Sequence, residues 1–84
     1  MPITTNNPSK NRYELITDGH VSVAEYVLEG STLTITRVFV PDELRGQGVA
    51  AKLMEAVISD AGERNLHIVP VCSYAQTYMT RHKL

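Results

Sequence analysis

The chain has 84 residues, of which 43% are hydrophobic and 20% are charged. This composition fits one small globular domain and excludes a multidomain protein and a disordered chain. The formal net charge is −1 and neither half of the sequence is basic, which argues against sequence-independent nucleic-acid binding. No apolar run approaches the roughly 20 residues of a membrane helix, so we expect no membrane interaction.

The single cysteine excludes an internal disulfide, and together with three scattered histidines it makes no metal cage. The first residues are polar and lack the apolar core of a signal peptide. We therefore expect a reduced, cytoplasmic protein without a metal site.

The first part of the domain has the pattern of an antiparallel sheet. Residues 1–11 are polar and aperiodic, so we expect a flexible N-terminal segment followed by one domain over residues 12–84. Three β-prone runs follow at Arg12–Thr17, His20–Leu28 and Thr32–Val40. An Asp-Gly dipeptide and then a Glu-Gly-Ser turn separate these runs, which predicts a three-stranded antiparallel meander.

The apolar pattern changes phase within the third run. Leu33 and Ile35 have one parity, whereas Val38 and Val40 have the other. Side chains alternate between the two faces of a strand, so this change predicts a β-bulge near Thr36–Arg37. The alternative is a strand end that is buried on both faces.

A helical period begins at Gly46 and ends near Arg64–Asn65. The apolar stripe of this helix consists of Val49, Leu53, Ala56, Val57 and Ala61. Leu66–Val71 then reads as a short strand, and its Pro70 favours either an edge position or a strand that splays at that point. Ser73 and Gln76 have the spacing of a capping box and predict a second helix over Tyr74–His82.

This order, βββ-α-β-α, predicts an α+β fold. A helix that connects two strands of one sheet favours a parallel pair between them. We therefore expect a mixed sheet with an antiparallel meander and one parallel pair.

The segment Arg45-Gly46-Gln47-Gly48-Val49-Ala50 lies between a strand and a helix. Two glycines let a ligand approach the backbone, and the first turn of a helix offers N–H groups and partial positive charge to a phosphate. The alternative is that the glycines only form a sharp turn. A dinucleotide fingerprint is disfavoured because no acidic residue follows about twenty positions later, and a P-loop lacks its Gly-Lys-Ser/Thr.

Several motifs resemble those of the GCN5-related acyl-CoA N-acetyltransferases, the GNAT family. Arg45-x-x-Gly48-x-Ala50, which follows Val40-Pro41-x-Glu43, is similar to the pyrophosphate-binding motif of that family. Val69-Pro70-Val71-Cys72-Ser73-Tyr74 and Tyr78-x-x-x-His82 resemble the tail of its small, single-domain members. The resemblance covers roughly residues 12–84 and implies a minimal GNAT-like core with acetyl-CoA as cofactor.

The resemblance also implies a set of cofactor-binding residues. The backbone amides from Gln47 to Ala51 would hold the CoA pyrophosphate, Arg45 would lie at the mouth of the loop, and the backbone from Val38 to Val40 would pair with the pantetheine arm. The expected cofactor-binding residues are Val38, Val40, Arg45, Gly46, Gln47, Gly48, Val49, Ala50 and Ala51.

Two residues are candidates for the chemistry. Tyr78 is a plausible proton donor to the departing thiolate, because a phenol and an alkyl thiol have similar pKa values; the alternative is an aromatic core position, which we expect for Tyr74. In the small subfamily the cysteine matching Cys72 is a candidate active-site residue, and a thiol at a helix N-terminus is suited to nucleophilic attack. Its alternative role is that of a small buried hydrophobe.

Two functions from different classes remain open. The first is an acetyl-CoA-dependent N-acetyltransferase that acts on an unidentified amine, such as a protein lysine or a small amine. The second is a non-catalytic CoA- or acyl-CoA-binding or protein-interaction module. This second function is an alternative because the sequence lacks the acceptor-site helices and the C-terminal hairpin of larger relatives. An exposed sheet edge would also allow a weak homodimer or a partner protein.

Overall fold

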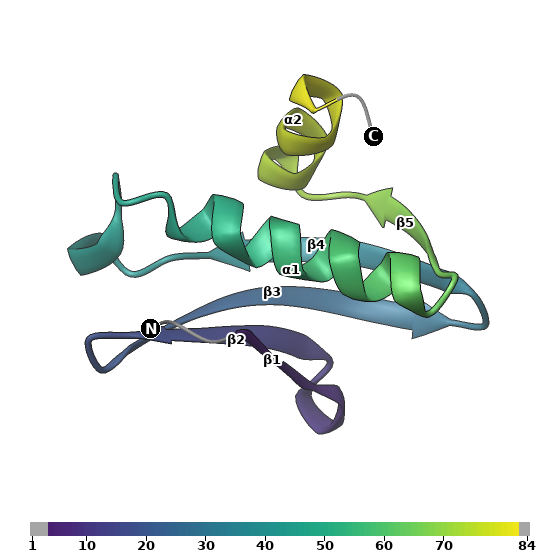
Figure 1. Cartoon of the computed structure of the whole chain (residues 1–84), viewed down its shortest axis with the longest axis horizontal. Coiled ribbons are helices and arrows are strands. Elements are labelled where there is room, and N and C mark those ends of the chain that lie inside the picture. The colour runs from purple at the N-terminus through teal and green to yellow at the C-terminus, as the bar shows by residue number, and fades with distance from the viewer. Residues whose placement is uncertain (1–3, 83–84) are drawn as a thin grey trace.

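Five strands form one sheet in the order β1-β2-β3-β4-β5 in the computed structural model, which describes residues 4–82 (Figure 1). The strands are β1 (Thr4–Asn7), β2 (Arg12–Thr17), β3 (His20–Glu29), β4 (Thr32–Phe39) and β5 (His67–Pro70). The helices are α1 (Val49–Glu63) and α2 (Ser73–Arg81), with short 3-10 helices at Pro8–Lys10 and Asp42–Leu44. Strands β1 to β4 pair antiparallel and β5 pairs parallel with β4, which confirms the expected α+β fold and mixed sheet.

Part of the segment that we expected to be flexible belongs to the sheet. Thr4–Asn7 form the edge strand β1 beside β2, while Met1–Ile3 lie outside the described residues. The hydroxyl of Tyr26 in β3 donates a hydrogen bond to the side chain of Asn6 over 2.7 Å. These contacts are tertiary, so the aperiodic sequence of the segment contains no sign of them.

The predicted β-bulge is present in β4. Glu25 lies opposite Arg37, but its neighbour Tyr26 lies opposite Ile35, so Thr36 is the extra residue. The Thr36 hydroxyl donates to the backbone oxygen of Glu25 over 3.3 Å. The bulge brings the apolar side chains that follow it back to the face that packs against the core.

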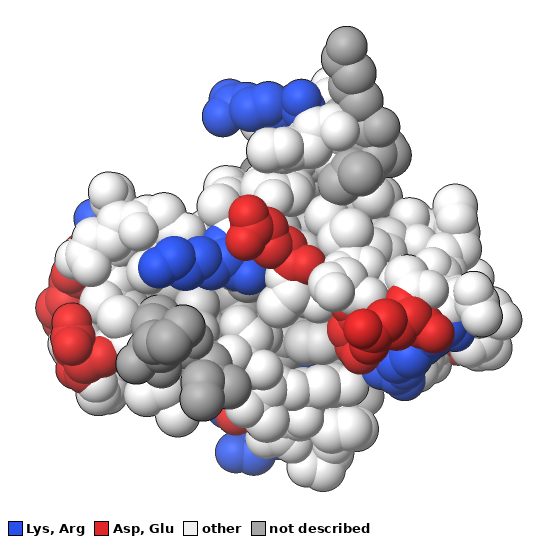
Figure 2. Space-filling model, viewed as in Figure 1, with Lys and Arg blue, Asp and Glu red and all other residues white. Residues whose placement is uncertain are grey.

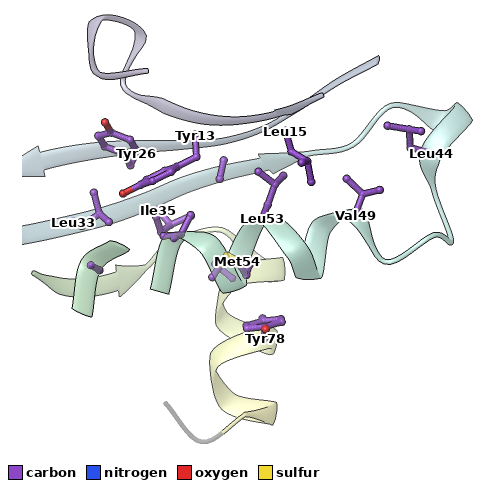
Figure 3. Packing of buried hydrophobic residues seen from close by; sticks show 14 residues of the cluster. Tyr13, Leu15, Tyr26, Leu33, Ile35, Leu44, Val49, Leu53, Met54 and Tyr78 are labelled. Atoms are coloured by element: carbon purple, nitrogen blue, oxygen red, sulfur yellow. The ribbon is translucent and has the colours of Figure 1, made fainter. Parts of the chain in front are cut away.

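Helix α1 covers one face of the sheet, and the core lies between them (Figure 3). The buried residues of the sheet are mainly Tyr13, Leu15, Ala24, Tyr26, Leu33 and Ile35. Those of α1 are Val49, Leu53, Met54, Val57 and Ala61. The predicted stripe is correct except that Ala56 is half-buried and Met54 is fully buried. Met54 lies on the side of α1 that faces α2, which widens the buried stripe (Figure 3).

A polar contact links the C-terminal half of α1 to β2. The hydroxyl of Tyr13 donates to the carboxylate of Asp60, which also pairs with Arg64 over 3.0 Å. Burial, supported by Asp60, raises the pKa of Tyr13, so the phenol keeps its proton. Burial alone would raise the pKa of Asp60, but the hydrogen bonds from Tyr13 and Arg64 outweigh it and hold that pKa below its usual range.

Strand β5 is an edge strand, as its proline predicted. The N–H of His67 donates to Ser31 and the N–H of Val71 donates to Ile35, so alternate residues of β5 face β4. By the same alternation the backbone nitrogen of Pro70 faces the open edge of the sheet. The N–H that proline lacks would therefore have no strand to pair with. A short edge with a proline is also a poor template for strand addition.

Neither helix of the described chain has the length and apolarity needed to cross a lipid bilayer. Within residues 4–82, no three His, Cys, Asp or Glu side chains gather as metal ligands would. Basic and acidic side chains lie next to each other over the face seen in Figure 2, without a continuous basic surface.

Candidate functional site

The glycine turn between β4 and α1 has a backbone that only glycine adopts easily. Gly46 has a φ of 83° and Gly48 has a φ of 74°. A Cβ built on either residue would meet no atom within 4 Å. The glycines are therefore required by the backbone conformation and not by close packing, and the space in front of them is open.

Helix α1 begins directly after this turn with Gly48 as its N-cap. The N–H of Lys52 donates to the Gly48 oxygen over 3.2 Å, so the N–H groups of Val49–Ala51 have no partner within the helix. No side chain caps this end of α1. The turn thus presents backbone donors and the positive end of a 15-residue helix to an anion.

Two predicted members of the loop are held by the protein itself. The N–H of Gln47 donates to Leu44 over 3.3 Å, which commits this expected pyrophosphate donor to the turn. Arg45 donates from Nε to the Val40 oxygen over 3.3 Å and pairs with Asp42 over 3.1 Å. Its side chain is 65% exposed, so the guanidinium is open to solvent beside the glycine turn.

A hollow of about 160 Å³ lies against this turn. Its lining consists of Val40, Leu44, Arg45, Gly46, Gly48, Val49, Ala50, Ala51 and Tyr74. Seven of the nine predicted cofactor-binding residues are in this set, while Gln47 and Val38 are not. Tyr74 was expected in the core but is 36% exposed and belongs to the wall of the hollow.

The free edge of β4 leads away from the hollow. Pairing between β4 and β5 ends at Ile35 and Pro70, although β4 continues to Phe39. The N–H groups of Val71 and Cys72 both donate to the Ile35 oxygen, over 2.9 and 3.1 Å. Figure 1 shows the chain turning away from β4 after β5 and entering α2. Beyond Ile35, this edge of β4 therefore has no neighbouring strand in the described chain.

Cys72 lies where the two strands separate, and it is also the N-cap of α2. Its backbone is extended, with φ −71° and ψ 145°, and its sulfur accepts a hydrogen bond from the Ala75 N–H over 3.3 Å. The prediction of Ser73 as the N-cap was therefore wrong by one residue. The side chain of Gln76 does not complete a capping box with Ser73 but donates to the Val71 oxygen over 3.2 Å.

Tyr78 points toward α1 and not into the hollow (Figure 3). It is 9% exposed and belongs to the core cluster, with its ring 4.2 Å from that of His82 and 6.2 Å from that of Tyr74. Burial and, to a lesser extent, the charge of Glu55 raise the pKa of Tyr78. The fold thus brings Tyr74 to the glycine turn and places Tyr78, one turn further along the same face of α2, in the core.

Known proteins are similar to this chain in sequence and in fold. A sequence model of the GCN5-related N-acetyl-transferase family matches residues 12–84. A GCN5-like protein of Staphylococcus aureus, solved by NMR, is 28% identical with a TM-score of 0.76, over 96% of this chain and 80% of that one. A predicted acetyltransferase of Clostridium acetobutylicum, crystallised with acetyl-CoA, is 15% identical with a TM-score of 0.60.

The similarity to the Clostridium protein, at 15% identity, shows the fold alone. It covers 87% of this chain but only 56% of the Clostridium protein, so the chain spans little more than half of that relative. The family match, in contrast, covers nearly the whole described chain. The chain belongs to the GCN5-related N-acetyltransferase family, whose members take the acetyl group from acetyl-CoA.

Proposed function

We propose that this chain binds acetyl-CoA between its glycine turn and Cys72 and transfers the acetyl group to an amine, either a small amine or a protein lysine. One observation carries the proposal: the free edge of β4 connects the hollow at α1 with the point where β4 and β5 separate. A cofactor in which an extended arm joins a pyrophosphate to a thioester fits this path.

The hollow suits the pyrophosphate. The N–H groups of Val49–Ala51 and the exposed guanidinium of Arg45 all offer donors or positive charge at one end of the path. Phosphate groups prefer such helix N-termini, because the peptide dipoles and the unpaired N–H groups act together. The open space in front of Gly46 and Gly48 lets the phosphates approach the backbone.

The free edge of β4 suits the pantetheine arm, whose amides can pair with backbone groups as a strand would. Val38 and Val40 lie on this part of β4 and directly after it. The Val40 oxygen already accepts the Arg45 side chain, so Val38 carries more of this pairing in our proposal. The acetyl end of the arm would then reach Cys72.

The transfer requires three events. The nitrogen of a neutral amine attacks the thioester carbonyl and forms the C–N bond. The C–S bond then breaks. The nitrogen loses one proton, and the CoA thiolate takes up one. We propose Cys72 as the group beside the thioester. We propose Tyr78, which lies on the helix that Cys72 caps, as the proton donor, because a phenol carries a proton at neutral pH.

Acetyl-CoA should stabilise the folded protein strongly and specifically. A ligand at a hundredfold excess over its Kd adds about 2.7 kcal/mol to the free energy of unfolding. For a domain of this size that free energy corresponds to a rise in Tm of roughly 10 °C or more. Thermal melts with acetyl-CoA, and with ATP and NAD as controls, measure this shift. No shift at millimolar acetyl-CoA would contradict the proposed binding.

Replacement of Tyr78 by phenylalanine should lower kcat and leave acetyl-CoA binding unchanged. The ring and its packing remain, so only the hydroxyl is lost, and removal of a general acid costs about 100-fold in rate. Release of free CoA thiol in the presence of an amine panel measures kcat. An unchanged kcat would restrict Tyr78 to its packing role between α2 and α1.

A further inference from the structure

Tyr74 is the one residue of the hollow's lining that comes from outside the segment 40–51. It is the second residue of α2, two positions after Cys72. The hollow therefore has two walls of different origin: the glycine turn with the start of α1, and the side chain of Tyr74. The start of α2 completes a site that the glycine turn alone would leave open on this side.

The ring of Tyr74 is supported by the core. It lies 6.2 Å from the ring of Tyr78, which is 9% exposed and packed within the core cluster. Among residues 4–82, no group hydrogen-bonds to the Tyr74 hydroxyl. Burial, with a smaller contribution from Tyr78, raises the pKa of Tyr74, so this hydroxyl is protonated at neutral pH and acts as a donor.

We infer that Tyr74 is a cofactor-binding residue whose hydroxyl donates a hydrogen bond to a pyrophosphate oxygen of acetyl-CoA, opposite the N–H groups of Val49–Ala51. This inference rests on the proposed function. A neutral donor that faces a phosphate adds a charge-assisted hydrogen bond without the desolvation cost of a second cation. Tyr74 lines the phosphate end of the path, and Cys72 does not line the hollow, so its contribution is to affinity and not to the chemical step.

The test compares a complete and a truncated ligand. Tyr74→Phe keeps the ring and removes the hydroxyl, so we expect the Kd for acetyl-CoA to rise about tenfold, the usual scale of a hydrogen bond to a charged group. S-acetylpantetheine lacks the pyrophosphate, and we expect its Kd to be the same for the wild type and the variant. NMR titration measures both constants, since it resolves millimolar affinities.

Tyr26→Phe is the matched control. It also removes one tyrosine hydroxyl, the one bonded to Asn6, but at the other end of the core from Val49 and the glycine turn (Figure 3). We expect its acetyl-CoA affinity to equal that of the wild type. A general effect of losing a tyrosine hydroxyl on folding would lower the affinity of both variants.

Three results would overturn the inference, and they are distinguishable. An unchanged Kd for acetyl-CoA in Tyr74→Phe would show that the Tyr74 hydroxyl does not bind the pyrophosphate, and it would leave the proposed function intact. An equal loss of affinity for S-acetylpantetheine would show that Tyr74 contacts the pantetheine arm or the acetyl group and not the pyrophosphate. A wild-type protein that does not bind acetyl-CoA would overturn the proposed function and the role of Tyr74 together.

Discussion

Gly48→Glu should abolish acetyl-CoA binding, with a Kd at least about 100-fold above that of the wild type. Gly48 has a φ of 74°, and a glutamate is strained in this left-handed conformation by about 1 kcal/mol. The larger effect is electrostatic and steric. The new side chain would enter the open space in front of the Val49–Ala51 N–H groups and place a carboxylate where the proposal puts a phosphate.

Two control variants separate these contributions. Gly48→Asn introduces a side chain that tolerates positive φ and carries no charge, so we expect a much smaller loss of affinity. Gly62→Glu adds the same carboxylate near the far end of α1, where a Cβ also meets nothing within 4 Å, and should bind acetyl-CoA as the wild type does. Calorimetric titration gives the three constants. A folded Gly48→Glu protein with wild-type affinity would show that the phosphate does not bind at this turn.

The elements that could be predicted from the sequence are those with a local pattern. The alternation of β2, β3 and β4, the stripe of α1 and the phase change at Thr36 all follow from residues that are close together in the chain. The glycine turn was also predictable, because the positive φ at Gly46 and Gly48 restricts the residue type.

The features that could not be predicted depend on tertiary contacts. Strand β1 has no periodicity and is supported by β2 and by Tyr26. Tyr74 and Tyr78 have the spacing of one helical stripe, yet α2 places the first at the hollow and the second in the core. No pattern in the sequence separates these two environments, because it is the position of α2 relative to β4 that separates them.

The N-cap of α2 was missed for a different reason. Ser73 and Gln76 have the spacing of a capping box, and this local pattern favours Ser73 as the cap. In the structure Cys72 has the extended backbone of a cap and Ala75 donates to its sulfur. The cysteine proposed for chemistry therefore also has a structural role, and an experiment on its function must keep these two roles apart.

The variants Cys72→Ser and Cys72→Ala separate the structural role of Cys72 from its proposed chemical role. Serine retains an N-cap, since its oxygen can accept the Ala75 N–H, whereas alanine loses the cap at a cost of about 1 kcal/mol. We expect Cys72→Ser to melt close to the wild type and Cys72→Ala to melt roughly 4–8 °C lower. If the thiol acts in the transfer, both variants should lose turnover by at least about 100-fold, because both lack it.

The route through Cys72 can then be read from intact mass. In a covalent route the thiolate attacks the acetyl carbonyl, CoA leaves as a thiolate that takes up a proton, and the amine next displaces the Cys72 sulfur. The wild type incubated with acetyl-CoA alone would then become one acetyl group heavier, and neither variant would. Loss of turnover without this mass gain would indicate direct transfer with Cys72 beside the thioester. A Cys72→Ser protein with wild-type turnover would show that the thiol takes no part in the transfer and would leave Cys72 its role as the cap of α2.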